Sequence, residues 1–204
     1  MLTPHFETIA EGLFTNASRV TEDNDNSGNG IIQASLASLT SLCQASCANS
    51  DPSLLQMLQT ILMHLKVTIE TPAQGSQKNL EVQSVLCGLI QVIMVRVGHN
   101  VDVPTAESIV GLIIQSFQQH QKVTEAGLIA YQGVCLGLKE RVPIREFGQY
   151  IYNALQQHED EDATRLAIGI VIDIADGLRE QVAQYLSSLI PSLLQVLRDN
   201  NRQQ

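Results

Sequence analysis

Two short segments of this sequence are near copies of each other, and they constrain the fold more than any other feature. Gly137–Val142 reads GLKERV, and Gly177–Val182 reads GLREQV forty residues later. Each copy separates two stretches in which large apolar residues recur every three to four positions, the spacing of one buried helix face. A period of about 40 residues made of helix pairs is typical of HEAT and armadillo arrays. One such pair cannot enclose its own apolar face, so the pattern predicts a stack of pairs.

The same periodicity predicts an all-α chain of about nine helices. The expected helix starts are Pro4, Ile31, Asp51, Leu80, Pro104, Val123, Pro143, Asp162 and Gln181. The stretches Asn16–Gly30 and Thr71–Asn79 are predicted loops, the first because it is rich in Asn, Gly and acidic residues. The other connections are short, which favours antiparallel hairpins stacked side by side.

We therefore predict a HEAT-repeat α-solenoid that forms a single array over residues 1–204. Its repeats are expected near residues 1–50, 51–100, 101–142 and 143–180, followed by an unpaired helix at 181–199. The second helix of each pair should line the concave side. The low aromatic content, 4% with no Trp, agrees with helix-on-helix packing.

The charge of the chain argues against nucleic acid as a partner. Against 12 Lys and Arg residues stand 21 Asp and Glu residues, which leaves a formal net charge of −9. Phosphate binding depends largely on Lys and Arg, so this composition favours a basic protein partner instead.

The cysteines and the apolar stretches indicate neither secretion nor a membrane span. The four cysteines lie inside apolar helical patterns, where thiols usually act as small buried side chains, and no secretory signal precedes them. The most apolar stretches, Val85–Val97 and Leu166–Ala175, are shorter than the about 20 residues that a span requires. We expect a reducing compartment and no membrane insertion.

One acidic run is the strongest candidate for a metal or catalytic site. Residues 158–162, HEDED, place four carboxylates beside an imidazole. The run lacks the alternating spacing and the glycine of a calcium loop, and acidic side chains are favourable at a helix start for electrostatic reasons. We expect no enzyme activity, no metal and no cofactor; the alternative is an enzyme that uses this run as its site.

Several stretches resemble the importin-beta (karyopherin-beta) family of nuclear transport receptors. The likeness is clearest in Ala167–Ala175, AIGIVIDIA, followed by Ile190–Leu194, IPSLL. Phe6–Ile9 and Leu80–Cys87 are also similar to the family in order and spacing. The resemblance covers essentially the whole chain and suggests a fragment from the late-middle part of the family's HEAT-repeat array.

The resemblance implies a function in nuclear import. Receptors of this family bind a basic importin-alpha-type arm or a basic cargo on the inner face, release it on contact with Ran-GTP, and bind Phe-Gly nucleoporins on the outer face. The resemblance also implies a location in the cytoplasm, in the nucleus and at the nuclear pore and envelope. The alternative is a HEAT-repeat scaffold or adaptor subunit for other protein partners.

Helical spacing places polar side chains together on one face of the predicted second helices. Small and acidic side chains there would let a partner's backbone approach and would pair with its Lys or Arg. The candidate partner-binding residues are Glu81, Glu125, Gln132, Arg165, Asp173, Asp176 and Glu180. The alternative for each is an ordinary solvated face. For Asp173, which lies among isoleucines, the alternative is a buried hydrogen bond between repeats.

Aromatic and apolar residues of the predicted first helices are candidates for the outer face. Nucleoporin binding there would require shallow apolar pockets between neighbouring first helices. The candidate contacts are Phe147, Tyr150, Ile151 and Tyr185. The alternative is that these side chains pack between helices.

Overall fold

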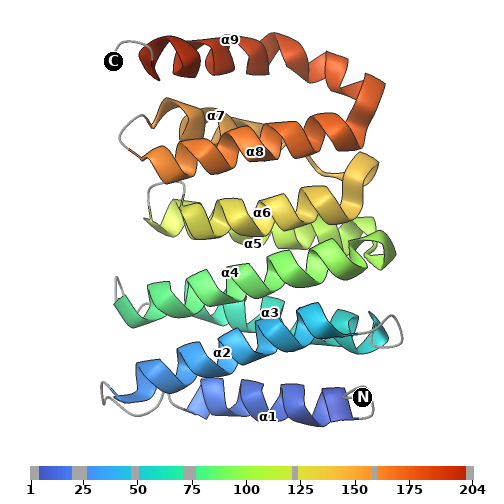
Figure 1. Ribbon diagram of the computed structural model, residues 1–204, viewed down its shortest axis with the longest axis vertical. Helices are drawn as coiled ribbons and strands as arrows, with labels where there is room; N and C mark the ends of the chain where they lie inside the picture. The colour runs from blue at the N-terminus through green and yellow to red at the C-terminus, as the bar shows by residue number, and fades with distance from the viewer. Residues whose placement is uncertain are drawn as a thin grey trace.

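The computed structural model describes residues 5–19, 27–46, 51–70, 77–120, 124–157 and 160–200. Within these ranges the fold is all-α, as predicted, with no strand. The α-helices, labelled in Figure 1, are α1 Phe6–Arg19, α2 Ser27–Ala45, α3 Asp51–Glu70, α4 Gln77–Val97, α5 Val103–His120, α6 Glu125–Leu138, α7 Gly148–Gln156, α8 Glu161–Leu178 and α9 Ala183–Asn200. Short 3-10 helices follow α4, α6 and α8: η3 Gly98–Asn100, η4 Lys139–Arg141 and η5 Arg179–Val182.

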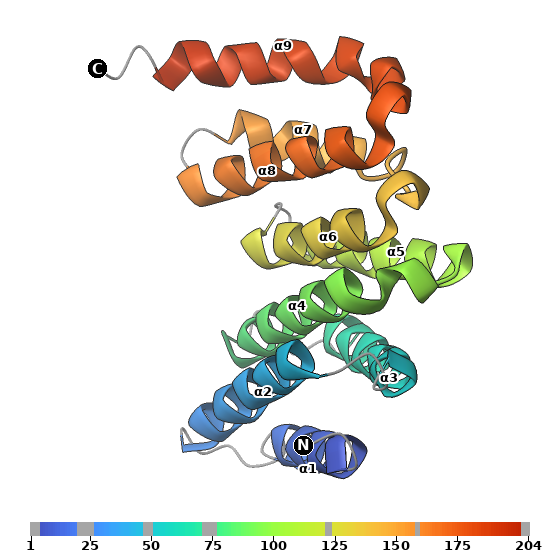
Figure 2. The same cartoon turned by 45° about the vertical axis from the view of Figure 1, so that its right-hand side comes forward.

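The helices are stacked in two layers. Each odd-numbered helix from α1 to α7 packs against the even-numbered helix that follows it, and α9 packs on α7 (Figures 1 and 2). The even-numbered helices also pack on one another along the whole series, whereas α1 and α3, like α5 and α7, approach each other less closely. We call α2, α4, α6 and α8 the inner layer, because the more tightly packed layer lies inside the curve of a solenoid, and the odd-numbered helices the outer layer.

A single apolar core runs between the two layers. It consists mainly of Leu, Ile and Val side chains, and each one that is fully buried contributes roughly 1.5–3 kcal/mol. Each helix pair therefore shares this core with the pairs on either side of it.

The two copies of the repeated hexapeptide form the same backbone turn. Lys139 and Arg179 follow α6 and α8 with φ angles of 53° and 51°, a region that residues with a Cβ atom rarely adopt. The backbone N–H of each donates to the helix carbonyl four residues earlier, that of Cys135 or Ala175. The sequence repeat therefore reflects a repeated junction geometry between an inner helix and the next outer helix.

Four predicted helix boundaries differ from the structure by three residues or more, and three of them differ for the same reason. α1 continues past Asn16 to Arg19, and α2 already begins at Ser27, so both ends of the predicted loop are helical. α4 begins at Gln77 and not at Leu80. Glycine and asparagine weaken a helix by less than about 1 kcal/mol each, and packing against neighbouring helices outweighs that. The intervening residues 20–26 and 71–76 lie outside the described ranges.

The start of α7 differs for another reason. The prediction placed it at Pro143, but α7 begins at Gly148, after a turn in which the Ile144 carbonyl accepts from the N–H groups of Phe147 (3.0 Å) and Gly148 (2.9 Å). The turn buries both Ile144 and Phe147. Core packing thus replaces the first turn that the proline signal predicts.

One described segment, Leu80–Asn100, is long and apolar enough to cross a membrane by length and composition alone. Its side chains Ile90, Ile93 and Met94 are fully buried between neighbouring helices. With 21 residues, the segment is longer than the apolar stretch Val85–Val97 expected from the sequence. Of its most apolar window, 44% is buried inside the stack, and helices that form a protein core have a similar composition.

Candidate functional site

The inner layer presents one narrow exposed ridge on each of α4, α6 and α8. Residues on these ridges are spaced three to four apart, as the prediction required. Nearly all the remaining positions of α6 are buried, because that helix has inner-layer neighbours on both sides. The exposed or half-buried ridge residues of α6 are Glu125, Ile129, Gln132 and Leu136. A partner lying across this layer would contact these ridges first.

The predicted residues Gln132 and Asp173 are brought together by the fold. The Gln132 Nε2 atom donates to the Asp173 Oδ2 atom at 2.9 Å, joining α6 to α8. Both side chains are half-buried. The hydrogen bond between repeats, which was the alternative for Asp173, is therefore present, and the carboxylate remains partly open to the inner surface.

The other predicted polar residues lie at the two ends of the ridges. Glu125 is exposed in the first turn of α6, which Thr124 caps by accepting from the Gly127 N–H at 3.2 Å. Asp176 and Glu180 are exposed at the far end of α8 and in η5. The inner helices run in the same direction (Figure 1). The predicted acids therefore fall into two groups, one near the amino-terminal ends and one near the carboxyl-terminal end, and do not form one continuous stripe.

Two further predicted residues are Arg165 on α8 and Glu81 on α4. Arg165 forms an exposed ion pair with Asp162, one turn before it on α8, and such pairs contribute less than about 1 kcal/mol. Glu81 is half-buried near the start of α4. Both lie at the amino-terminal ends of the ridges, away from Asp176.

The sequence analysis missed an apolar component of the inner surface. Val95, Leu136 and Ile172 are 52%, 40% and 56% exposed, on α4, α6 and α8 in turn. Leu136 follows Gln132 by one helical turn, and Ile172 precedes Asp173 directly. The ridge spacing that selected the polar residues also passes through these positions, so the same signal could have found them.

A second missed feature is a clasp between two successive turns. The Arg141 guanidinium donates to the backbone carbonyls of Val101 (2.9 Å), Gly98 (3.1 Å) and His99 (3.0 Å). It therefore ties η4 to η3 with charge-assisted hydrogen bonds. The second hexapeptide has Gln181 at this position, so the repeat alone could not reveal the clasp.

The outer-face candidates are mostly packing residues. Phe147 and Ile151 are 0% and 1% exposed, so the packing alternative applies to both. Phe147 stacks on Tyr131 with ring centroids 3.5 Å apart and contacts Tyr150 at 5.8 Å. Tyr150 and Tyr185 are half-buried and present part of their surface to solvent.

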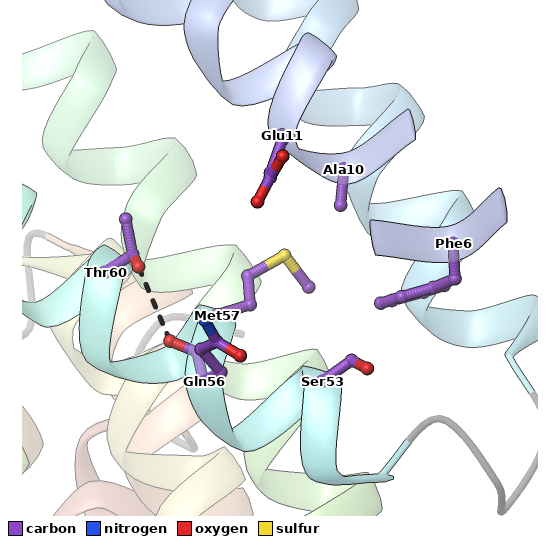
Figure 3. Close-up of a pocket in the computed structure, with 7 residues that line it drawn as sticks. All are labelled: Phe6, Ala10, Glu11, Ser53, Gln56, Met57 and Thr60. Atoms are coloured by element: carbon purple, nitrogen blue, oxygen red, sulfur yellow. Dashed lines mark hydrogen bonds between the residues drawn. The ribbon is translucent and has the colours of Figure 1, made fainter. Parts of the chain in front are cut away.

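An open pocket lies elsewhere in the outer layer, between α1 and α3. Its volume is about 110 Å³. Figure 3 shows the Met57 side chain at its centre, with Phe6 and Ala10 on one side and the Glu11 carboxylate facing it from α1. Ser53, Gln56 and Thr60 of α3 complete the lining. The pocket thus combines an apolar floor with a polar rim.

The three described thiols, those of Cys43, Cys87 and Cys135, are buried and poor nucleophiles. Burial raises the pKa of Cys43 and of Cys87 to about 12. It also raises the pKa of Cys135, and the nearby Asp173 carboxylate adds to that shift. Thiolate chemistry at neutral pH is therefore unfavourable at these three positions.

No metal site is formed by the described side chains. Among them, no group of three or more His, Cys, Asp or Glu residues could hold a metal ion. In the predicted acidic run, Asp160 caps α8 by accepting from the Ala163 N–H at 3.0 Å, and Glu161 and Asp162 are exposed in its first turn. His158 and Glu159 lie outside the described ranges.

The comparisons with known proteins agree on one family. The family described as importin subunit beta-1-like, TPR repeats, matches residues 1–204. The chain is 26% identical over 215 residues to importin subunit beta-1 of Arabidopsis thaliana and 25% identical over 210 residues to that of Schizosaccharomyces pombe. Each alignment covers 98% of this chain and 24% of the relative. The chain therefore spans about a quarter of the length of these relatives.

The fold is similar to that of solved importin beta structures. A crystal structure of importin beta in a polyethylene glycol condition matches with a TM-score of 0.84 and 22% identity, over 95% of this chain and 24% of that one. A crystal structure of importin beta in an ammonium sulfate condition matches with a TM-score of 0.87 and 23% identity, over 97% and 23%. At these identities the likeness extends to the fold, a HEAT-repeat solenoid.

Proposed function

Because the chain belongs to the importin subunit beta-1-like family of nuclear transport receptors, we propose that it is a segment of a nuclear import receptor. In this proposal the inner layer binds a basic importin-alpha-type arm or a basic cargo, and Ran-GTP regulates its release. The segment then acts in the cytoplasm and the nucleus and passes the pore. In this proposal the chain is a segment of a transport receptor and not an enzyme.

The arrangement around the carboxyl-terminal half of α8 carries this proposal. Ile172 directly precedes Asp173 on α8, and Asp176 follows about one turn later. On α6 the exposed Leu136 lies one turn after Gln132, which donates to Asp173. A basic helix that also has apolar positions would match this surface with both charge and apolar contact. The formal net charge of −9 adds a long-range attraction for such a segment.

A pair of charge-reversal variants tests the proposal. The chain with Asp173→Lys and Asp176→Lys is compared with one carrying Glu107→Lys and Glu146→Lys, two exposed acids outside the inner layer. Both variants change the net charge equally. With a fluorescent importin-alpha arm peptide, the inner variant should bind at least about tenfold more weakly, because close charge pairs across an interface contribute more than 1 kcal/mol each.

Equal affinity of the two variants would contradict the proposal. Circular dichroism melting of both proteins shows whether each remains folded. The milder pair Asp173→Asn and Asp176→Asn retains the side-chain shape and should lose affinity without a charge reversal. If the parent chain binds other native proteins and neither the arm peptide nor Ran-GTP, the scaffold alternative is favoured.

Phe-Gly nucleoporin binding by the outer layer belongs to the same proposal. The half-buried Tyr150 and Tyr185 support it more than the buried Phe147 and Ile151 do. The pocket between α1 and α3 also supports it, since its apolar floor could accept a ring. A Phe-Gly peptide should slow amide hydrogen exchange in the outer layer, while a Ser-Gly peptide of equal length should not. The same exchange rates with both peptides would contradict this part.

A further inference from the structure

A 3-10 helix follows each of α4, α6 and α8 and gives these inner helices a common reference point. The 3-10 helices η3, η4 and η5 begin at Gly98, Lys139 and Arg179. Counting seven residues back from the first two starts gives Gln91 on α4 and Gln132 on α6. The two interfaces, which we call the α4–α6 seam and the α6–α8 seam, can therefore be compared position by position.

In the α4–α6 seam the backbones of the two helices are in direct contact. Gly133 of α6 lies against the Gln91 backbone, and a Cβ atom at that glycine would overlap the Gln91 Cα atom. Gly137 lies against the Met94 carbonyl and Gly98; a Cβ atom added at Gly98 would lie 2.6 Å from the Gly137 Cα atom. At these glycines no side chain separates the two backbones.

At the equivalent position of the α6–α8 seam, a carboxylate replaces the glycine. Gly133 and Asp173 both lie six residues before the start of the following turn. Whereas Gly133 contacts the Gln91 backbone, Asp173 accepts from the Gln132 side chain at 2.9 Å. One polar contact between side chains thus takes the place of direct backbone packing.

The rest of the α6–α8 seam is also less tight. A Cβ atom at Gly177 would lie 3.1 Å from the Lys139 Cα atom, and one at Gly169 would lie 3.5 Å from the Gln132 Nε2 atom. The carbonyl clasp of Arg141 joins η4 to η3 and so adds to the α4–α6 seam. The α6–α8 seam therefore depends more on a single hydrogen bond than the α4–α6 seam does.

We infer that the Gln132–Asp173 hydrogen bond is a latch that holds the α6–α8 seam closed. A basic side chain of a partner pairs with the Asp173 carboxylate, breaks this hydrogen bond and so opens the seam. The α4–α6 seam stays closed during that exchange. The source of the basic side chain, an importin-alpha-type arm or a basic cargo, rests on the proposed function. The latch in the free chain does not depend on it. Partner binding would in this way change the curvature of the solenoid at one defined joint.

Spin-label distances in the 204-residue chain test the inference. Labels at Ser84, Glu125 and Glu161, all exposed in the amino-terminal halves of α4, α6 and α8, report each seam in pairs. Each label is attached to a cysteine introduced at that position, and Cys47 is replaced by Ser. A control sample without the introduced cysteines checks that the buried native thiols do not react with the label. The variant Gln132→Leu removes the latch donor. The matched control Gln91→Leu changes the equivalent residue of the α4–α6 seam.

We expect Gln132→Leu to shift or broaden the α6–α8 distance by about 2 Å and to leave the α4–α6 distance unchanged, since packed helices move by such amounts at interfaces. Gln91→Leu should change neither distance. Addition of the arm peptide to the parent chain should reproduce the α6–α8 change of Gln132→Leu.

An unchanged α6–α8 distance in Gln132→Leu overturns the latch, whether or not the peptide binds. A changed distance in this variant together with no peptide binding supports the latch and contradicts the proposed function. A peptide that binds without moving the α6–α8 distance overturns the coupling between them.

Discussion

The inner and outer layers solve the same packing problem in opposite ways. In the inner layer, α4 and α6 meet over glycines, so their backbones touch. In the outer layer, α5 and α7 meet through aromatic rings, with the Phe117 centroid 5.7 Å from that of Phe147 and 5.3 Å from that of Tyr150. Glycines on the inner side and large rings on the outer side give this part of the stack a wedge shape. The comparison indicates that side-chain size at a few positions sets the curvature, and through it the shape of the inner surface.

Removal of a large aromatic ring that separates outer helices, which we call a spacer, should have the largest effect. Phe147→Ala should lower the free energy of unfolding by about 4 kcal/mol, because it deletes a fully buried ring and leaves a cavity. Urea denaturation followed by circular dichroism measures this change. The control Tyr152→Ala removes a ring that is 44% exposed and should cost much less. Equal losses for the two variants would contradict the role of Phe147 as a spacer.

Addition of a methyl group between the touching backbones of the inner layer should lower the stability of the fold by nearly as much. Gly137→Ala places a methyl group against the Met94 carbonyl and should destabilise the fold by about 3 kcal/mol, because neither backbone can move freely. The control Gly88→Ala also lies on an inner helix but meets no atom within 4 Å, so it should be neutral or stabilising. Thermal melts of both variants are the measurement. A neutral Gly137→Ala would show that the close approach of α4 and α6 is not required.

Loss of the clasp between inner turns should have an intermediate effect. Arg141→Ala leaves the carbonyls of Gly98, His99 and Val101 without this donor and should cost about 2 kcal/mol. Hydrogen exchange at η3 should become faster in the same variant. Arg145→Ala, a change to an exposed arginine four residues later, serves as the control. If both variants exchange alike, the clasp does not hold the turn.

Relief of backbone strain at the repeated turn should have the smallest effect and the opposite sign. Lys139→Gly and Arg179→Gly should each raise the free energy of unfolding by about 1 kcal/mol, since glycine adopts their positive φ angles without a Cβ conflict. Denaturant midpoints of the single and double variants test this, and the two gains should add. Glu140→Gly, at a neighbouring position without positive φ, should instead destabilise the fold.

The sequence determined the architecture of this protein. The forty-residue copy and the three-to-four apolar spacing are local properties of the chain, and a helix pair with one apolar face has few ways to bury it other than stacking. For the same reason the helix starts at Asp51 and near Pro104 were predicted to within one residue, because capping and first-turn proline signals act over a few positions.

Only the tertiary structure decided which residues face which neighbour. Helical spacing placed Gln132 and Asp173 on exposed ridges correctly, but it could not show that they bond to each other, because that depends on the register between α6 and α8. The same register makes Gly133 and Gly137 contact points and turns Arg141 into a clasp. It also buries Phe147, which the sequence alone allowed on the surface. Periodicity fixes the face of a helix, whereas the relative shift of two helices is set by the side chains between them, and these come from distant parts of the chain.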